Sequence, residues 1–208
     1  MRWCEPLYEP QAQASPGSRS RQWRWPAWLT VLLLALFALG LPRAGWAQSD
    51  WAAVQSGSIV LFRHANAPGF SDPPGFTLSD CSSQRNLDAT GRAQARRIDE
   101  QFRSWGIPVG EVLSSQWCRT RETAQLAFPG LSHDAAPFNS FFETSERQTA
   151  QTAAALAILK QWQGPGVLVV VTHQVNITAL TGVSPASGQG VIVKTGEGGL
   201  AVLGRVQP

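Results

Sequence analysis

Two short apolar runs, at residues 58–63 and 167–171, predict buried strands. The second run is uninterrupted and mostly β-branched, which is typical of a central strand covered on both faces. Residues 87–105 predict a helix, because apolar side chains recur there at intervals of three and four. These side chains are Ala95, Ile98, Phe102 and Trp105. Gly106 and Pro108 then end the helical pattern.

The remaining segments continue the alternation of strands and helices. The further predicted elements are a strand over 111–114, helices over 117–128 and 147–162, a short helix from Gln174, and edge strands near 190–193 and 200–206. Residues 66–86 and 129–142 are predicted to be irregular, and the first of these is long enough to suggest a functional loop. The alternation predicts an α/β fold, a three-layer sandwich with a mostly parallel central sheet flanked by helices.

The first 47 residues have the order of a secretory signal. A basic and aromatic segment precedes residues 27–41, which are apolar except for Thr30 and Gly40, and small residues follow up to Ala47. Cleavage after Ala47 would leave residues 48–208 as a single domain. The alternative is an uncleaved membrane anchor, although the apolar run is short for a span that needs about 20 residues. In both cases the positive flank places the domain outside the cytoplasm, in the periplasm.

The basic character of the chain belongs to this leader. The leader holds five arginines and two glutamates, so the net charge of +3 lies there and residues 48–208 carry equal numbers of basic and acidic side chains. A domain with no charge excess does not favour nucleic acid as a partner. Its sequence also has no Cys, His and Asp cluster with metal-ligand spacing, so we expect neither a metal nor another cofactor.

Two histidines directly follow the two most clearly predicted strands. His64 comes after the first strand and His173 after the second. Ligands of open α/β sheets bind beyond the carboxyl ends of the strands, so both imidazoles are expected to face one crevice. Arg63 and Arg119 are suited to bind phosphate oxygens there, the latter from the start of a helix. Arg121, by contrast, is expected to form a solvated pair with Glu122.

Five segments, in order, resemble those of the histidine phosphatase superfamily, which is also called phosphoglycerate mutase-like. They are Leu61-Phe62-Arg63-His64-Ala65, the helix start over residues 87–95, the arginine motif over residues 114–124, Val170-Val171-Thr172-His173-Gln174, and the turn Gly196-Glu197-Gly198-Gly199. The resemblance covers about residues 57–206, which is nearly all of the predicted domain.

The resemblance implies a mechanism of phosphate transfer. His64 would be the nucleophile and would form a phosphohistidine, which divides one difficult step into two easier ones. Arg63, Arg119 and His173 would bind the phosphoryl oxygens and stabilise their negative charge in the transition state. Water would then hydrolyse the intermediate without a metal ion.

The proton donor to the leaving group is open at this stage. Many members of the family take an acid from a loop between the second and third motifs, and Glu143 is the candidate there, with Glu146 behind it. Either glutamate could instead stabilise the first turn of the following helix. Some small members of the superfamily have no acid at this place.

Two cysteines remain once the leader, with Cys4, is set aside. They are Cys81, in the long loop, and Cys118, beside Arg119. In an oxidising compartment we expect them to form a disulfide at the border of the site. The alternative is two buried thiols.

The chain thus looks like a phosphatase of a branch with short insertions, a monomer or a weak dimer. Few residues separate Phe128 from Ala154, which predicts an open site and a bulky or exposed phosphorylated substrate. Residues 139–142 and 172–178 resemble small exported members linked to phosphate on the lipopolysaccharide core, an envelope phosphosugar. A protein phosphohistidine phosphatase and a non-catalytic phosphate- or phosphosugar-binding module are the alternatives. A mutase is disfavoured, because retaining and re-transferring phosphate favours a closed site.

Processing of the leader is a testable prediction. Mass spectrometry of the protein recovered from cells should find a mature chain that begins at Gln48. A mature chain that begins at Met1 would contradict cleavage and would leave the uncleaved anchor as the explanation.

Overall fold

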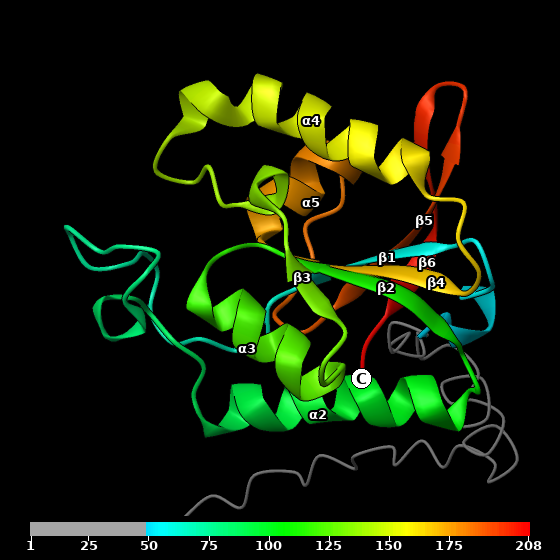
Figure 1. Cartoon of the computed structure of the whole chain (residues 1–208), viewed down its shortest axis with the longest axis horizontal. Coiled ribbons are helices and arrows are strands. Elements are labelled where there is room, and N and C mark those ends of the chain that lie inside the picture. Colours follow the sequence, from blue (N-terminus) through cyan, green and yellow to red (C-terminus); the bar gives the residue numbers. More distant parts are fainter. Residues whose placement is uncertain (1–48) are drawn as a thin grey trace, which may run out of the picture. The chain divides into compact units, whose positions relative to one another are not determined.

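The computed structural model describes residues 49–208, which are organised around one six-stranded sheet (Figure 1). Its strand order is β3-β2-β4-β1-β5-β6. The strands are β1 (Ile59–Arg63), β2 (Val109–Ser114), β3 (Ser132–Asp134), β4 (Val167–Thr172), β5 (Gly190–Gly196) and β6 (Gly199–Val206). The first four strands of this order run parallel, whereas β5 and β6 join them as an antiparallel pair.

Helices cover both faces of the sheet, which confirms the predicted three-layer α/β fold (Figure 1). The helices are α2 (Ala89–Ser104), α3 (Cys118–Ala127), α4 (Gln148–Gln161) and α5 (Gln174–Thr181). Four short 3-10 turns lie between the main elements, at Trp51–Ala53, Cys81–Ser83, Ala136–Phe138 and Ser145–Arg147. The helices α2 and α3 lie on one face, and α4 and α5 lie on the other.

Strand β4 contributes side chains to the two larger hydrophobic cores, and every one of its residues is buried. Val169 and Val171 pack in the core that holds Ile98 and Phe102 of α2. Leu168 and Val170 instead pack in the core beneath α4 and α5. Because side chains alternate along a strand, an uninterrupted apolar run is what burial on both faces requires.

Three sequence-based expectations about the elements are wrong. β3 lies within residues 129–142, which were expected to be irregular; it has three residues, Ser-His-Asp, with no apolar pattern and is held by its pairing with β2. β5 is not an edge strand, because it pairs with both β1 and β6. Trp105 was expected on the buried face of α2 but is 52% exposed, because it caps the helix after Ser104.

The predicted leader lies outside the described residues, so its cleavage and its role as an anchor stay predictions. Among residues 49–208, no helix combines the length and apolar character that a membrane crossing needs.

The long loop after β1 is fastened to the start of α3. Cys81 and Cys118 form the predicted disulfide, with their Cα atoms 5.6 Å apart. The side chain of Gln84 adds a second tie, because its Oε1 accepts a hydrogen bond of 2.9 Å from the backbone N–H of Cys118. The loop is thereby held against the helix that carries Arg119.

The close approach of α2 to this loop yields a stability prediction. A methyl group at Gly91 would overlap the carbonyl oxygen of Asn66, two residues after His64. Replacing glycine by alanine in a helix normally stabilises by about 1 kcal/mol. We expect Gly91→Ala to destabilise the protein instead, by about 1–3 kcal/mol, because backbone must move.

Urea denaturation measures this effect. Arg97→Ala, on the exposed side of the same helix, is the control and should change stability by less than about 0.5 kcal/mol. A Gly91→Ala variant as stable as the wild type would mean that the contact with Asn66 does not constrain the fold.

Candidate active site

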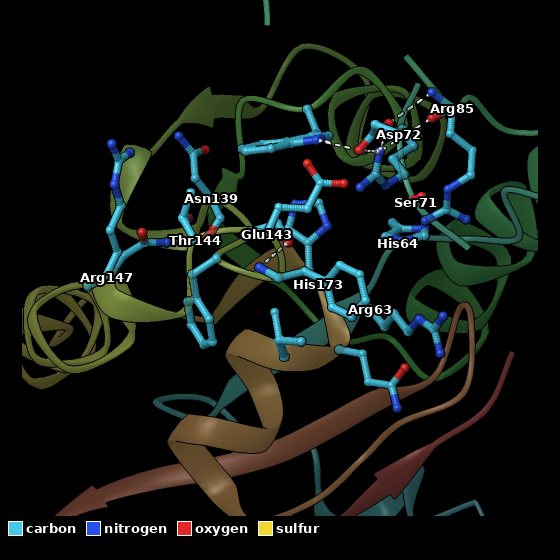
Figure 2. A pocket seen from close by; sticks show the side chains of 18 of the residues that line it. Arg63, His64, Ser71, Asp72, Arg85, Asn139, Glu143, Thr144, Arg147 and His173 are labelled. Carbon is cyan, nitrogen blue, oxygen red and sulfur yellow. Dashed lines mark hydrogen bonds and ion pairs between the residues drawn. The ribbon is translucent and has the colours of Figure 1, made fainter. Parts of the chain in front are cut away.

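A cavity of about 1130 Å³ opens where the central parallel strands end (Figure 2). β1 and β4 are neighbours, with Arg63 opposite Thr172, so the next residue of each strand leaves the sheet at the same edge. These next residues are His64 and His173, and their ring centroids lie 5.5 Å apart. Arg63 and Arg119 also line the cavity. The structure therefore brings together the four residues that the sequence predicted to act on phosphate.

The His64 ring is held in one tautomer. Its Nδ1 lies 2.8 Å from the carbonyl oxygen of Ala65, and a carbonyl only accepts, so Nδ1 carries the hydrogen. Nε2 has no hydrogen-bond partner within residues 49–208 and is not enclosed by protein, which leaves its lone pair open to the cavity. Burial, and then the positive charge of Arg119, lower the pKa of His64 from 6.5 to about 3. The imidazole is therefore neutral and nucleophilic at ordinary pH.

The His173 ring is oriented by a serine. Its Nε2 lies 2.8 Å from Oγ of Ser115, a buried residue directly after β2. Trp117 packs edge-on against the ring, with centroids 5.2 Å apart. Burial, and then nearby positive charges, hold the pKa of His173 well below 6.5. The hydroxyl of Ser115 has one hydrogen, and its two acceptors are Nε2 of His173 at 2.8 Å and Oδ1 of Asn139 at the longer distance of 3.3 Å. When the hydroxyl donates to Nε2, the neutral ring carries its hydrogen on Nδ1, where it can donate to a phosphoryl oxygen.

Each of the two predicted arginines is anchored by one nitrogen. Nη1 of Arg63 donates to the carbonyl of Pro185 at 3.1 Å. Nη1 of Arg119 donates to both carboxylate oxygens of Asp72, at 2.8 and 3.1 Å, and both side chains of this pair are almost completely buried. Such anchoring fixes the guanidinium groups before an anion binds, which lowers the reorganisation that binding requires.

Sequence reasoning missed two residues at the site, Asp72 and Arg85, which both come from the loop after β1 and line the cavity (Figure 2). Asp72 also accepts hydrogen bonds from Nε1 of Trp117 at 3.0 Å and from the backbone N–H of Arg85 at 2.9 Å. Burial opposes the ionisation of Asp72, but these hydrogen bonds and the contact with Arg119 outweigh it, so its pKa lies below the usual value. A charged residue in an irregular loop carries no periodic signal that could have revealed either residue.

The expected pair between Arg121 and Glu122 is wrong. Arg121 instead binds Asp134 of β3, with a contact of 2.8 Å from Nε. Glu122 binds Arg92 of α2, at 2.6 Å. The helix directs these neighbouring side chains to different elements, because adjacent residues do not share a face.

Only the first of the two candidate proton donors lines the cavity. Glu143 lies on the segment before α4, and Figure 2 shows its carboxylate directed into the cavity above His173. Glu146, in the 3-10 turn that precedes α4, is not among the lining residues. The donor role of Glu143 stays a prediction.

Metal binding has no evident site in the part of the chain that the structure describes. Within it, no three His, Cys, Asp or Glu side chains group closely enough to hold an ion. The chemistry available to the cavity is thus a neutral imidazole with an open lone pair, fixed cationic groups, and two carboxylates, of which that of Asp72 is paired with Arg119. This combination is suited to phosphoryl transfer.

Comparisons with known proteins agree with this geometry. A family model described as histidine phosphatase superfamily (branch 1) matches residues 59–135. The match confirms the predicted resemblance to the histidine phosphatase superfamily over these residues. The matched segment contains Arg63, His64 and Arg119, and His173 lies beyond it. No curated protein matches the sequence.

Solved structures with the same fold have low sequence identity to this chain. The α-ribazole phosphatase from Shigella flexneri has 15% identity and a TM-score of 0.52, and the match covers 71% of this chain and 95% of that one. Phosphoglycerate mutase from Thermus thermophilus has 18% identity and a TM-score of 0.51, over 73% and 99% of the two chains. The protein histidine phosphatase SixA, complexed with tungstate, has 15% identity and a TM-score of 0.50, over 73% and 97%. At such identities these structures support the fold, and the family match supports a histidine phosphatase enzyme.

The lowered pKa of His64 can be tested directly. In a nuclear magnetic resonance titration the ring should stay neutral from pH 7 down to about pH 4, since its pKa lies near 3 and not near 6.5. Arg119→Met removes one of the charges that disfavour the imidazolium, so the His64 pKa should rise but stay below 6.5, because burial persists. A wild-type midpoint close to 6.5 would contradict the neutral, buried nucleophile.

Proposed function

We propose that the protein hydrolyses phosphomonoesters without a metal ion, through a phosphohistidine on His64. The observation that carries the proposal is the state of His64: a neutral ring, with Nε2 open to a cavity that guanidinium groups surround. A module that only bound phosphate would gain nothing from an uncharged imidazole at this point, since a cation would bind the anion better. Catalysis needs the lone pair.

The first step transfers the phosphoryl group to the enzyme. Nε2 of His64 forms a bond to phosphorus while the bond from phosphorus to the ester oxygen breaks, and the departing oxygen takes up a proton. Glu143 is the proposed donor of that proton, because its carboxylate faces the cavity. Arg63, Arg119 and the Nδ1–H of His173 hold the equatorial oxygens, whose negative charge they stabilise.

The second step returns the enzyme to its starting state. Water attacks phosphorus, the bond to Nε2 breaks, and inorganic phosphate leaves. The hydrogen bond from Nδ1 of His64 to the Ala65 carbonyl supports the positive charge that the ring carries while phosphorylated. Glu143, deprotonated by the first step, accepts the proton of the attacking water.

For the substrate, we propose an exported envelope phosphosugar of the lipopolysaccharide type. The cavity is far larger than a phosphate group, and two exposed phenylalanines contact each other at it, with ring centroids 5.1 Å apart. Phe70 is 82% exposed and Phe142 is 46% exposed. Apolar surface of this kind marks a binding site more often than chance exposure, and it suits a leaving group that has an apolar ring face. The predicted leader supports an envelope location, in the periplasm or anchored to face it.

A protein phosphohistidine phosphatase is the second candidate. The fold shared with SixA and an open cavity are compatible with it. A phosphoramidate leaving group also needs less help from an acid than an alcohol does. The predicted export of the chain disfavours it.

Hydrolysis of p-nitrophenyl phosphate in the presence of EDTA tests the proposed chemistry. The wild type should turn over, whereas His64→Ala should lose about 10³-fold or more in kcat. Arg121→Gln, whose arginine binds Asp134 away from the cavity, should keep wild-type activity. After brief mixing with labelled substrate, the wild type should carry phosphate that is stable to alkali and labile to acid. A folded wild type with no turnover over a broad pH range would favour the binding module.

The substrate class is tested with the same preparation. Phosphorylated lipopolysaccharide core oligosaccharides should be hydrolysed with a higher kcat/KM than a phosphohistidine-bearing protein. Phe70→Ala with Phe142→Ala should raise KM for the oligosaccharide and leave p-nitrophenyl phosphate much less affected. A preference for phosphohistidine protein would overturn the proposed substrate and support the second candidate.

A further inference from the structure

Arg85 lies beside the nucleophile, although no motif of the sequence assigns it a role. It comes from the loop after β1 and lines the same cavity as His64 and Arg119. Figure 2 shows its guanidinium group next to the His64 ring. Part of the positive charge around His64 thus comes from a residue outside the two strands and the helix that carry the predicted site.

The hydrogen bonds of Arg85 repeat the pattern of the two predicted arginines. Nη1 of Arg85 donates to the carbonyls of Ala67 and Gly69. Nη1 of Arg63 donates to Pro185, and Nη1 of Arg119 donates to Asp72. In all three, Nε is enclosed by protein, whereas Nη2 has no partner within residues 49–208 and is not enclosed. Each guanidinium group is therefore held by Nη1, has an accessible Nη2, and belongs to a residue that lines the cavity.

The electrostatics place Arg85 in the same cluster of charges. Its positive charge contributes to lowering the pKa of His64, of His173 and of Arg119, so it acts on all three groups from close by. Burial, and next Arg85, lower the pKa of Arg63 as well. Cations gathered in this way repel one another, and a bound dianion would relieve that repulsion.

Asp72 fixes the position of Arg85 relative to Arg119. Its carboxylate accepts from the backbone N–H of Arg85 at 2.9 Å and from Nη1 of Arg119 at 2.8 Å. The backbone carbonyl of Arg85 in turn accepts a longer bond of 3.4 Å from Nη1 of Arg119. The disulfide between Cys81 and Cys118 ties the same loop to the same helix. These contacts together hold the backbone of Arg85 beside Arg119.

We propose that Arg85 is a third arginine that binds the transferred phosphoryl group, through Nη2. The inference rests on the proposed function and extends it to the loop after β1. With Arg63, Arg119 and Arg85 in place, each equatorial oxygen of the transition state has a guanidinium group within the cluster. The loop is then part of the catalytic site and not only its cover.

Binding of tungstate, an oxyanion of the shape and charge of phosphate, tests the proposal without requiring turnover. Isothermal titration calorimetry measures this binding. The sample is the protein expressed from the full chain, with whatever processing the host carries out. Four proteins are compared: the wild type, Arg85→Gln, Arg85→Lys and Arg121→Gln. We expect Arg85→Gln to bind tungstate about tenfold or more weakly, since a charged hydrogen-bond donor is lost. Arg121→Gln, which removes a charge outside the cavity, should match the wild type.

Arg85→Lys separates anion binding from a purely structural role. A lysine has one nitrogen, which can replace Nη1 at the Ala67 and Gly69 carbonyls but cannot also reach the cavity as Nη2 does. The variant should therefore keep the loop in place and still bind tungstate several-fold more weakly than the wild type. Loop position is read from the indole N–H resonance of Trp117, which donates to Asp72.

The outcomes are distinct. Weaker tungstate binding in Arg85→Lys with an unchanged Trp117 resonance supports the proposal. Wild-type affinity in either Arg85 variant overturns it, and so does weaker binding that always accompanies a shifted Trp117 resonance, which would make Arg85 a positioning residue. If the wild type binds tungstate through Arg85 but hydrolyses no phosphomonoester, the proposed function is contradicted, whereas the role of Arg85 in anion binding is still supported.

Discussion

The parallel pairing of β1 and β4 underlies everything else at the site. Because Arg63 stands opposite Thr172, the chain leaves both strands at one edge of the sheet, and His64 and His173 follow there side by side. Both strands are buried in the centre of the sheet, so the two rings are buried as well. Burial makes them neutral, which gives His64 its free lone pair.

A neutral nucleophile alone would not attract a phosphate dianion, and the surrounding arginines supply the attraction. Gathering guanidinium groups in a buried site costs free energy, because they lose water and repel one another. The site offsets part of this cost by giving each Nη1 a carbonyl or carboxylate partner and by placing Asp72 against Arg119. The negative charge of a bound phosphate would offset the remaining repulsion among the arginines. The charges that repel one another in the empty site are therefore the same charges that attract phosphate.

The loop after β1 links stability to function. It contributes Asp72 and Arg85 to the cavity, and a disulfide and Gln84 hold it to α3. The same loop places Phe70 against Phe142 at the cavity. One segment thus touches the phosphate end and the leaving-group end of the proposed substrate, and specificity can change there without altering the sheet.

The sequence by itself determined five of the six strands of the central sheet, the helices that cover it, and four residues of the site. Each of these features depends on a short stretch of sequence: apolar periodicity predicts an element, and a residue directly after a buried parallel strand must lie at the carboxyl end of that strand.

The tertiary structure alone decided the other features. β3 has no apolar pattern and exists because β2 offers it a partner. β5 is an inner strand because the β6 hairpin folds back beside it. Arg121 meets Asp134 and not its neighbour Glu122, and Arg85 and Asp72 reach the site only because the loop closes onto α3. Contacts between segments far apart in the chain depend on the tertiary arrangement of the whole domain. The residues next to each other in the sequence therefore do not determine them.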